Sequence, residues 1–159
     1  MKLTILTVGK LKEAYLRDAV SEYAKRLTRY GKIEIIETAD ERTDENASDA
    51  ENLRVITEEG QRILAKIPKG AYVIALAIDG ETFDSVGMAE KIRALGNAGK
   101  SHLVFIIGGS LGLSKEVLSR ADERWSFSRL TFPHQLMRVI LAEQLYRSFR
   151  IINNEPYHK

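Results

Sequence analysis

The chain has 159 residues, of which 44% are hydrophobic; this can bury one substantial core but not two, so a single domain over residues 1–159 is expected. It contains no cysteine, which excludes disulfides and zinc-thiolate sites, and its three histidines are too scattered to indicate a metal cluster, so no metal is expected. No apolar run reaches transmembrane length and no signal-peptide pattern precedes the first strand, which predicts a cytoplasmic protein without membrane association.

The formal net charge of +2 conceals a strong asymmetry along the chain. Residues 1–30 carry a net charge of +4, residues 34–59 a net charge of −8, and residues 115–159 a net charge of +3. Charge runs are often only solvated helix faces. Alternatively, the two basic ends converge into a phosphate-facing surface from which the acidic segment points away.

Hydrophobic patterning divides the first half of the chain into alternating elements. In chain order these are a strand at residues 3–8, a helix at 11–30, a strand at 33–36, a polar loop at 38–48 and a helix from about 49 to 67. Gly31 stops the first helix, and Ser48 with Glu51 has the spacing of a capping box that opens the second.

The second half continues the alternation. In chain order it contains a strand at residues 72–78, a turn at Asp79-Gly80, a helix at 85–99 capped by Ser85, a strand at 103–107, a short helix after Ser114 and a strand at about 123–128. Strands that alternate with helices predict an α/β fold, with a mainly parallel sheet covered by helices on both faces.

The last helix, at about residues 134–152, is apolar around most of its circumference. One core-facing stripe does not need that much apolar surface, so the helix should pack on two sides. This pattern indicates a subunit interface.

A glycine-rich segment, Gly108-Gly109-Ser110-Leu111-Gly112, follows a strand and precedes a helix. Parallel sheets bind nucleotide-like ligands at this position, and glycine allows close backbone approach or a positive φ. The spacing is neither the dinucleotide-binding fingerprint nor a P-loop. The segment is therefore either an ordinary tight turn or part of a ligand site.

The C-terminal segment carries unusual chemistry for a chain end. Trp125-Ser126-Phe127-Ser128 leads through residues 129–134 into the last helix, and the chain stops at Tyr157-His158-Lys159. Chain ends usually fray, so a disordered tail is one interpretation. The concentration of proton-active and cationic groups behind an anchored helix favours a functional role instead.

This ending, together with Thr131-Phe132-Pro133-His134-Gln135, resembles the RlmH (YbeA-like) family of SPOUT methyltransferases, and the resemblance extends over residues 3–159. It implies a SPOUT fold with a C-terminal deep trefoil knot and S-adenosylmethionine bent within the knot. The resemblance places eight residues around this cofactor: Leu76, Gly108, Phe127, Ser128, Arg129, Leu130, Thr131 and Phe132.

Some of these positions have a second interpretation. Core packing is an alternative role for Phe127, Leu130 and Phe132. Relatives often carry an acidic residue after the Leu76 position, whereas this chain has Ala77, so no carboxylate can contact the cofactor from there.

The resemblance also implies functional roles for Arg147, Tyr157, His158 and Lys159. Methylation of a uracil-like ring nitrogen requires loss of an imino proton and a cationic environment for the resulting anion. His158 could accept the proton or position the base, Tyr157 could stack on it, and Lys159 with Arg147 could offset the negative charge.

Two residues have simple structural explanations as well. Arg147 lies four residues after Glu143, the spacing of a helical ion pair. His134, which follows Pro133 at a helix start, is expected to be a packing or capping residue.

The resemblance implies a homodimeric, metal-independent enzyme that uses S-adenosylmethionine to methylate N3 of a pseudouridine in large-subunit (23S) ribosomal RNA on the assembled ribosome. Two alternatives are a SPOUT enzyme acting on another RNA base or on ribose, and a noncatalytic ribosome-associated module that binds nucleotides. The generic glycines and weak net charge would suffice for the latter.

Overall fold

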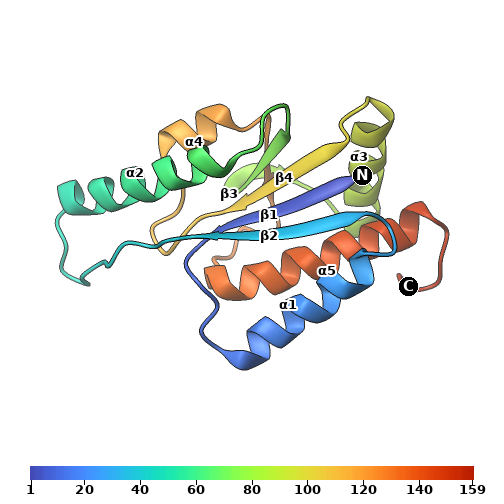
Figure 1. The fold of residues 1–159 in the computed structure, drawn as a ribbon, viewed down its shortest axis with the longest axis horizontal. Coiled ribbons are helices and arrows are strands. Elements are labelled where there is room, and N and C mark those ends of the chain that lie inside the picture. Colours follow the sequence, from blue (N-terminus) through green and yellow to red (C-terminus); the bar gives the residue numbers. More distant parts are fainter.

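Five parallel strands form one sheet in the order β2-β1-β4-β3-β5 in the computed structural model, which describes residues 1–159 (Figure 1). The strands are β1 (Lys2–Val8), β2 (Lys32–Thr38), β3 (Tyr72–Thr82), β4 (His102–Ile107) and β5 (Glu123–Ser126). Every pairing between neighbouring strands is parallel. The α/β fold with a mainly parallel sheet is therefore confirmed.

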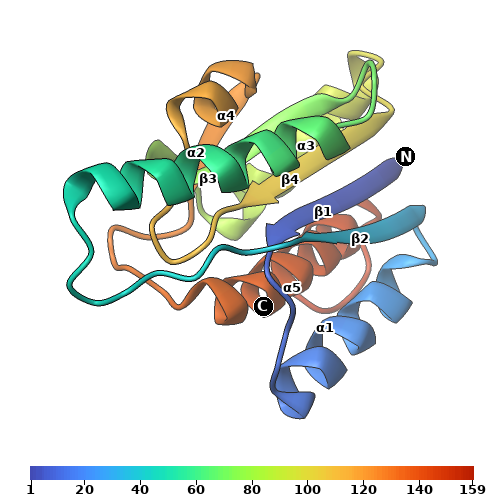
Figure 2. The same cartoon turned by 60° about the vertical axis from the view of Figure 1, so that its left-hand side comes forward.

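Helices cover both faces of the sheet (Figure 2). They are α1 (Ala14–Leu27), α2 (Asp49–Lys66), α3 (Ser85–Asn97), α4 (Lys115–Arg120) and α5 (His134–Ile152). Helices α2 and α4 pack on one face, and α1, α3 and α5 on the other (Figure 1). No helix of the structure is both long and apolar enough to cross a membrane.

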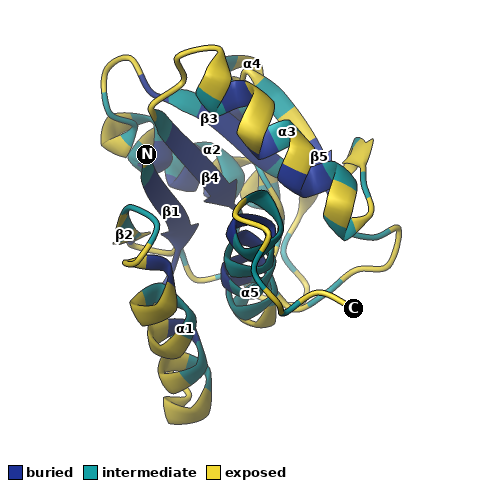
Figure 3. Ribbon diagram, turned by 90° about the vertical axis from the view of Figure 1, so that its right-hand side faces the viewer, coloured by how far each residue is buried: buried dark blue, intermediate teal, exposed yellow.

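Alternation along the strands builds a separate core under each helical layer. In β1, Leu3 and Ile5 face α1, α3 and α5, whereas Leu6 and Val8 face α2 and α4. Strands β1 and β4 are almost entirely buried, as Figure 3 shows. Their near-continuous apolar sequences follow from burial on both faces, and each fully buried Leu or Ile contributes about 1.5–3 kcal/mol.

One feature of β3 differs from the predictions. The predicted turn at Asp79-Gly80 is wrong, because β3 continues through these residues to Thr82. Its register against β5 shifts between Leu76 and Glu81. A Cβ on Gly80 would lie 2.6 Å from the Trp125 carbonyl carbon, so this glycine allows two backbones to approach closely rather than making a hairpin turn.

The caps of the helices follow local side chains. The predicted capping box at Ser48 and Glu51 is confirmed, and Ser114 caps α4. The expected cap of α3 is wrong by one residue, because Asp84 accepts from the Gly87 amide at 2.7 Å. Ser85 instead directs its hydroxyl to α5, where it donates to Gln144 Oε1 at 3.0 Å.

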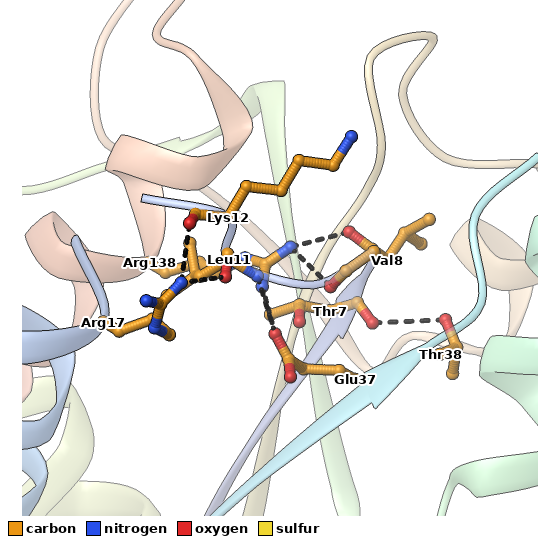
Figure 4. Close-up of polar contacts among 9 residues, drawn as sticks. Thr7, Val8, Leu11, Lys12, Arg17, Glu37, Thr38 and Arg138 are labelled. Atoms are coloured by element: carbon orange, nitrogen blue, oxygen red, sulfur yellow. Dashed lines mark hydrogen bonds and ion pairs between the residues drawn. The ribbon is translucent and has the colours of Figure 1, made fainter. Parts of the chain in front are cut away.

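Helix α5 is tied to the sheet by a buried arginine (Figure 4). Arg138 is 1% exposed, and its guanidinium donates to the Val8 carbonyl at 2.7 Å and to the Gly9 carbonyl at 2.9 Å. It also pairs with Glu37 on β2 at 2.9 Å. The start of α5 is thus fixed to the carboxyl ends of β1 and β2.

The apolar circumference of α5 is largely used within the chain. The helix packs against both α1 and α3, and Leu141 is 0% exposed. On the remaining side, Leu136 is 40% exposed and Ile140 is half-buried. Apolarity alone therefore does not establish a subunit interface, because internal packing accounts for most of it.

Candidate active site

A cavity of about 740 Å³ opens at the carboxyl ends of β3, β4 and β5. Most of its lining comes from three segments: residues 76–78 of β3, residues 107–113 at and after the end of β4, and residues 125–128 and 130–134 from the end of β5 to the start of α5. Leu118 and Met137 complete it. In parallel sheets the strand carboxyl ends are the usual place for ligands, because the connecting loops converge there.

All but one of the eight residues assigned to the cofactor line this cavity, and the exception is the exposed Arg129. Leu130 is 69% exposed at the wall, so core packing does not explain this residue. Leu76 and Phe127 also pack against the core beneath α3 and α5, so both interpretations apply to them. Seven of the eight residues predicted from the sequence therefore lie around one cavity, while their contact with a cofactor stays a prediction.

The glycine segment folds back on itself at the cavity wall. Gly112 has a φ of +87°, and its amide donates to the Gly109 carbonyl at 3.1 Å. A Cβ on Gly108 would lie 2.8 Å from the Gly112 carbonyl group. The turn itself therefore requires glycine at position 108. This requirement is compatible both with an ordinary tight turn and with a ligand site.

A buried carboxylate lies behind the same turn. Glu59 is 5% exposed, and a Cβ on Gly109 would lie 3.0 Å from its Oε1. Its other oxygen accepts from the Glu41 amide at 3.1 Å. Burial raises the pKa of the Glu59 carboxyl, although the Glu41 amide opposes this shift.

The loop on the opposite wall is shaped by two serines. Ser126 donates to the Ser128 carbonyl at 3.0 Å, and the Ser128 hydroxyl accepts from the Leu130 amide at 2.9 Å. These bonds fix a compact turn that leaves Leu130 at the cavity wall. Residues 127–128 follow β5 rather than extend it, which shortens the predicted strand.

His134 lies at the wall of the cavity, at the first residue of α5. It does not cap the helix, since the N-cap is Pro133 and no side chain bonds there. Burial, followed by the nearby Arg138 charge, lowers the pKa of the imidazole. His134 is consequently neutral at pH 7.

The chain end is ordered and folds back along α5. Tyr157 donates to Glu143 Oε1 at 3.0 Å, and its ring packs edge-on against Tyr146 at 4.9 Å between centroids. The Arg147 guanidinium lies 4.8 Å from the Tyr157 ring centroid and bonds Glu143 at 2.6 Å. Arg147 also contacts His158 Nδ1 at 3.3 Å.

A second set of contacts holds the turn before the tail. Asn154 adopts a left-handed φ of 53°, which reverses the chain. Glu155 accepts from the Tyr30 hydroxyl at 2.5 Å and pairs with Arg29 at 3.1 Å and with Arg150. The structure therefore contradicts a disordered tail. Of the predicted group, His158 and Lys159 are exposed; His158 contacts Arg147, and Lys159 is in no ion pair.

The electrostatics of the tail favour fixed charge states. Burial, then the hydrogen bond to Glu143, raises the pKa of Tyr157 to about 12. Tyr157 therefore stays a hydrogen-bond donor at neutral pH. The hydrogen bond to Glu143 also raises the pKa of Arg147, which stays a cation.

A second cavity, of about 430 Å³, adjoins the first. His158 lines this cavity and not the larger one, whereas Ser126 and Phe127 line both. The structure thus places seven of the eight proposed cofactor residues around the larger cavity and His158 at the second cavity. Ser126 and Phe127 form the wall that the two cavities share.

Sequence reasoning recognised Glu143 only as an ion-pair partner for Arg147. Its bond to Tyr157 depends on the chain reversal at Asn154, which helical spacing does not reveal. Gln144, which lines the second cavity, was missed altogether. The only available signal was its polar character within an otherwise apolar helix.

Comparisons with known proteins identify the family of the chain. A family model described as "Predicted SPOUT methyltransferase" matches residues 1–158. Proteins named ribosomal RNA large subunit methyltransferase H from Enterococcus faecalis and Listeria monocytogenes are 56% and 57% identical, over 100% of both chains.

Solved structures share the fold at low identity. A methylase family protein from Haemophilus influenzae superposes with a TM-score of 0.53 at 12% identity, covering 99% of this chain and 70% of that one. A Legionella pneumophila protein described as a methyltransferase, solved with bound SAM, gives a TM-score of 0.50 at 10% identity, covering 94% of this chain and 66% of that one. The full-length match at more than half identity is decisive: the chain belongs to the ribosomal RNA large subunit methyltransferase H family of SPOUT methyltransferases.

Proposed function

We propose that this protein methylates N3 of a pseudouridine in large-subunit ribosomal RNA, using S-adenosylmethionine and acting on the assembled ribosome. The observation that carries the proposal is the adjacency of a ligand-sized cavity and an ordered tail bearing Arg147, Tyr157 and His158. The names of the full-length relatives support ribosomal RNA as the substrate.

The larger cavity fits S-adenosylmethionine in size and chemistry. Its volume of about 740 Å³ lies in the range of cofactor sites. Leu76, Leu130 and Phe132 would form apolar walls around the adenosine, and the backbone of residues 108–112 would offer donors and acceptors to its polar edges. The bound SAM of the Legionella structure supports this assignment. When bound, the cofactor supplies an electrophilic methyl group on a sulfonium.

The tail supplies the groups that the RNA needs. An N3 imino group must lose its proton before the nitrogen can act as a nucleophile, and the anion that forms needs nearby positive charge. Arg147 is a permanent cation beside His158, and Lys159 follows it at the exposed chain end. Tyr157, fixed by Glu143, orients this group.

The contact between Arg147 and His158 favours one role for the imidazole. A guanidinium only donates hydrogen bonds, so His158 Nδ1 must accept in this contact. In the neutral imidazole the proton then resides on Nε2, which makes Nε2 a donor. We therefore assign His158 to stabilising the base anion by a hydrogen bond, and the imino proton leaves to water.

We also propose a homodimer in which α5 contributes to the interface. Leu136 is 40% exposed on the side of α5 that internal packing leaves accessible. Leu136→Glu should give monomers in sedimentation, because a carboxylate there would lose its solvation in the dimer. Leu141→Glu is unsuitable, since it would disrupt the core. A wild-type monomer would contradict the dimer.

The decisive experiment is mass-spectrometric mapping of methylated nucleotides after ribosomes, isolated subunits and naked ribosomal RNA are incubated with the protein and S-adenosylmethionine. A single new methyl group on N3 of a pseudouridine in intact ribosomes is the expected result. Methylation of another base or of ribose would contradict the assigned target, and no methylation would contradict the enzymatic function.

A further inference from the structure

We infer that the second cavity receives the flipped-out target base of the RNA, and that the Gln144 amide reads the edge of that base. This inference rests on the proposed function, because it assigns the nucleotide subsite of the same enzyme. Its occupant is a uracil-like pyrimidine in RNA. The cavity of about 430 Å³ has room for a base with its ribose.

The position of the cavity suits a base that must meet the methyl donor. Ser126 and Phe127 line both cavities, so a base in the second would lie across a shared wall from a ligand in the first. His158 lines the second cavity and bears the Nε2 donor described above. An anionic base in this cavity would thus lie beside the group that stabilises it.

The lining matches the two faces and the polar edge of a nucleobase. Its apolar part consists of Phe83, Val86, Met88, Phe127 and Ile140. Phe83 is itself held edge-on against Trp125, with ring centroids 5.1 Å apart. Enzymes that act on extruded bases commonly place them between aromatic or apolar side chains, because every base has a flat π-face.

The polar part of the lining is oriented in advance. Gln144 Oε1 accepts from Ser85 at 3.0 Å, and Gln144 Nε2 donates to Glu143 at 2.8 Å. These partners define which end of the amide is oxygen, and each end retains one free hydrogen-bonding position. The amide can therefore offer both a donor and an acceptor to a pyrimidine edge, which also alternates the two.

Asp84 is the one acidic residue in the lining of the cavity. The Asp84 carboxylate already accepts the Gly87 amide as the cap of α3. The Arg147 cation adjoins His158, which lines the cavity, and can meet the phosphate that flanks an extruded nucleotide. The Gln144 amide and the His158 donor in the lining favour a nucleotide over an apolar protein segment as the occupant.

Two variants test the subsite from different directions. Val86→Trp would fill the cavity from a position that is 41% exposed, so the fold should tolerate it. Gln144→Met would keep the side-chain length and remove the amide. Leu53→Trp is the matched control, since Leu53 is 62% exposed on α2 and lines neither cavity. Calorimetry would measure S-adenosylmethionine affinity, and ribosome methylation would give kcat/KM.

Val86→Trp should lower kcat/KM about 10²-fold because the base is displaced. Gln144→Met should lower it about tenfold, as expected for one lost hydrogen bond. Both should leave cofactor affinity unchanged, and Leu53→Trp should change neither quantity. Wild-type kcat/KM in both variants would overturn the subsite while leaving the proposed function intact. A wild-type protein that methylates no ribosomal RNA would overturn the proposed function and the subsite together.

Discussion

Tyr157 donates a hydrogen bond to Glu143 Oε1 at 3.0 Å across a sequence separation of 14 residues. The same carboxylate oxygen accepts from Arg147 at 2.6 Å. Glu143 therefore holds both the helix cation and the returning chain end. Glu143 thus anchors the chain end to α5, beside the separate contacts of Glu155 with Tyr30, Arg29 and Arg150.

Glu143→Ala should lower ribosome methylation about 10²-fold, because Arg147 and Tyr157 lose their common partner and the tail shifts. S-adenosylmethionine affinity should not change, since Glu143 does not line the larger cavity. Hydrogen exchange of residues 154–159 should accelerate. Glu58→Ala, which breaks a surface ion pair with Arg54 on α2, is the control and should affect none of these quantities. Unchanged exchange in the tail would refute the anchoring role.

His158→Gln should retain more methylation activity than His158→Ala, because glutamine keeps a neutral hydrogen-bond donor but cannot accept a proton at neutral pH. Removal of the donor in the alanine variant should cost about 10²–10³ in kcat. The comparison separates the two roles of the imidazole. If the glutamine variant is as inactive as the alanine variant, His158 acts as the general base instead.

Gly108→Ala should both destabilise the fold and weaken S-adenosylmethionine binding, because the new methyl group meets the Gly112 backbone. Overpacking of this kind costs about 1–3 kcal/mol. Gly70→Ala is a matched control: its φ is +77°, but nothing lies within 4 Å of the added Cβ, and it is remote from the cavity lining. Urea unfolding and calorimetry should show lost stability in both variants and lost affinity only at position 108.

Glu59→Gln should stabilise the protein at pH 7 and have little effect at pH 4. Burial raises the pKa of the Glu59 carboxyl in the folded state, so its contribution to stability is fully present below the unfolded pKa. That contribution is lost as the pH rises through the raised folded value. Glutamine avoids the buried charge and can still accept from the Glu41 amide. A variant less stable than the wild type at pH 7 in urea unfolding would contradict this reasoning.

The sequence predicted helix boundaries correctly where the hydrophobic periodicity and the capping residues indicate the same position. Helix α5 begins at His134 and ends at Ile152 as expected, and the capping box fixes the start of α2. The β3 boundary was wrong because Gly80 resembles a turn residue, whereas its actual role is close contact with the β5 backbone. That contact joins residues far apart in the chain and leaves no local pattern. The trefoil knot stays a prediction for the same reason.

The candidate site likewise divides into residues that a sequence motif reveals and residues that only the packing of distant elements brings together. The residues around the larger cavity follow from a family motif and lie together there, with the exception of Arg129. The neighbouring cavity requires α3 and α5 to pack side by side, so Gln144 and Val86 could not be paired from sequence. Spacing along one helix located Glu143 beside Arg147 but not its contact with the chain end.

The packing of α5 has a consequence for how the protein is made. This helix follows all five strands in the sequence, yet Leu141 and Leu145 of α5 complete the core on one face of the sheet. A nascent chain that lacks them would leave Phe105 and Trp125 without that cover. Folding of the sheet during synthesis therefore cannot be completed before α5 has been made, and a chain truncated before α5 would expose an aggregation-prone apolar face of the sheet rather than give a less active enzyme.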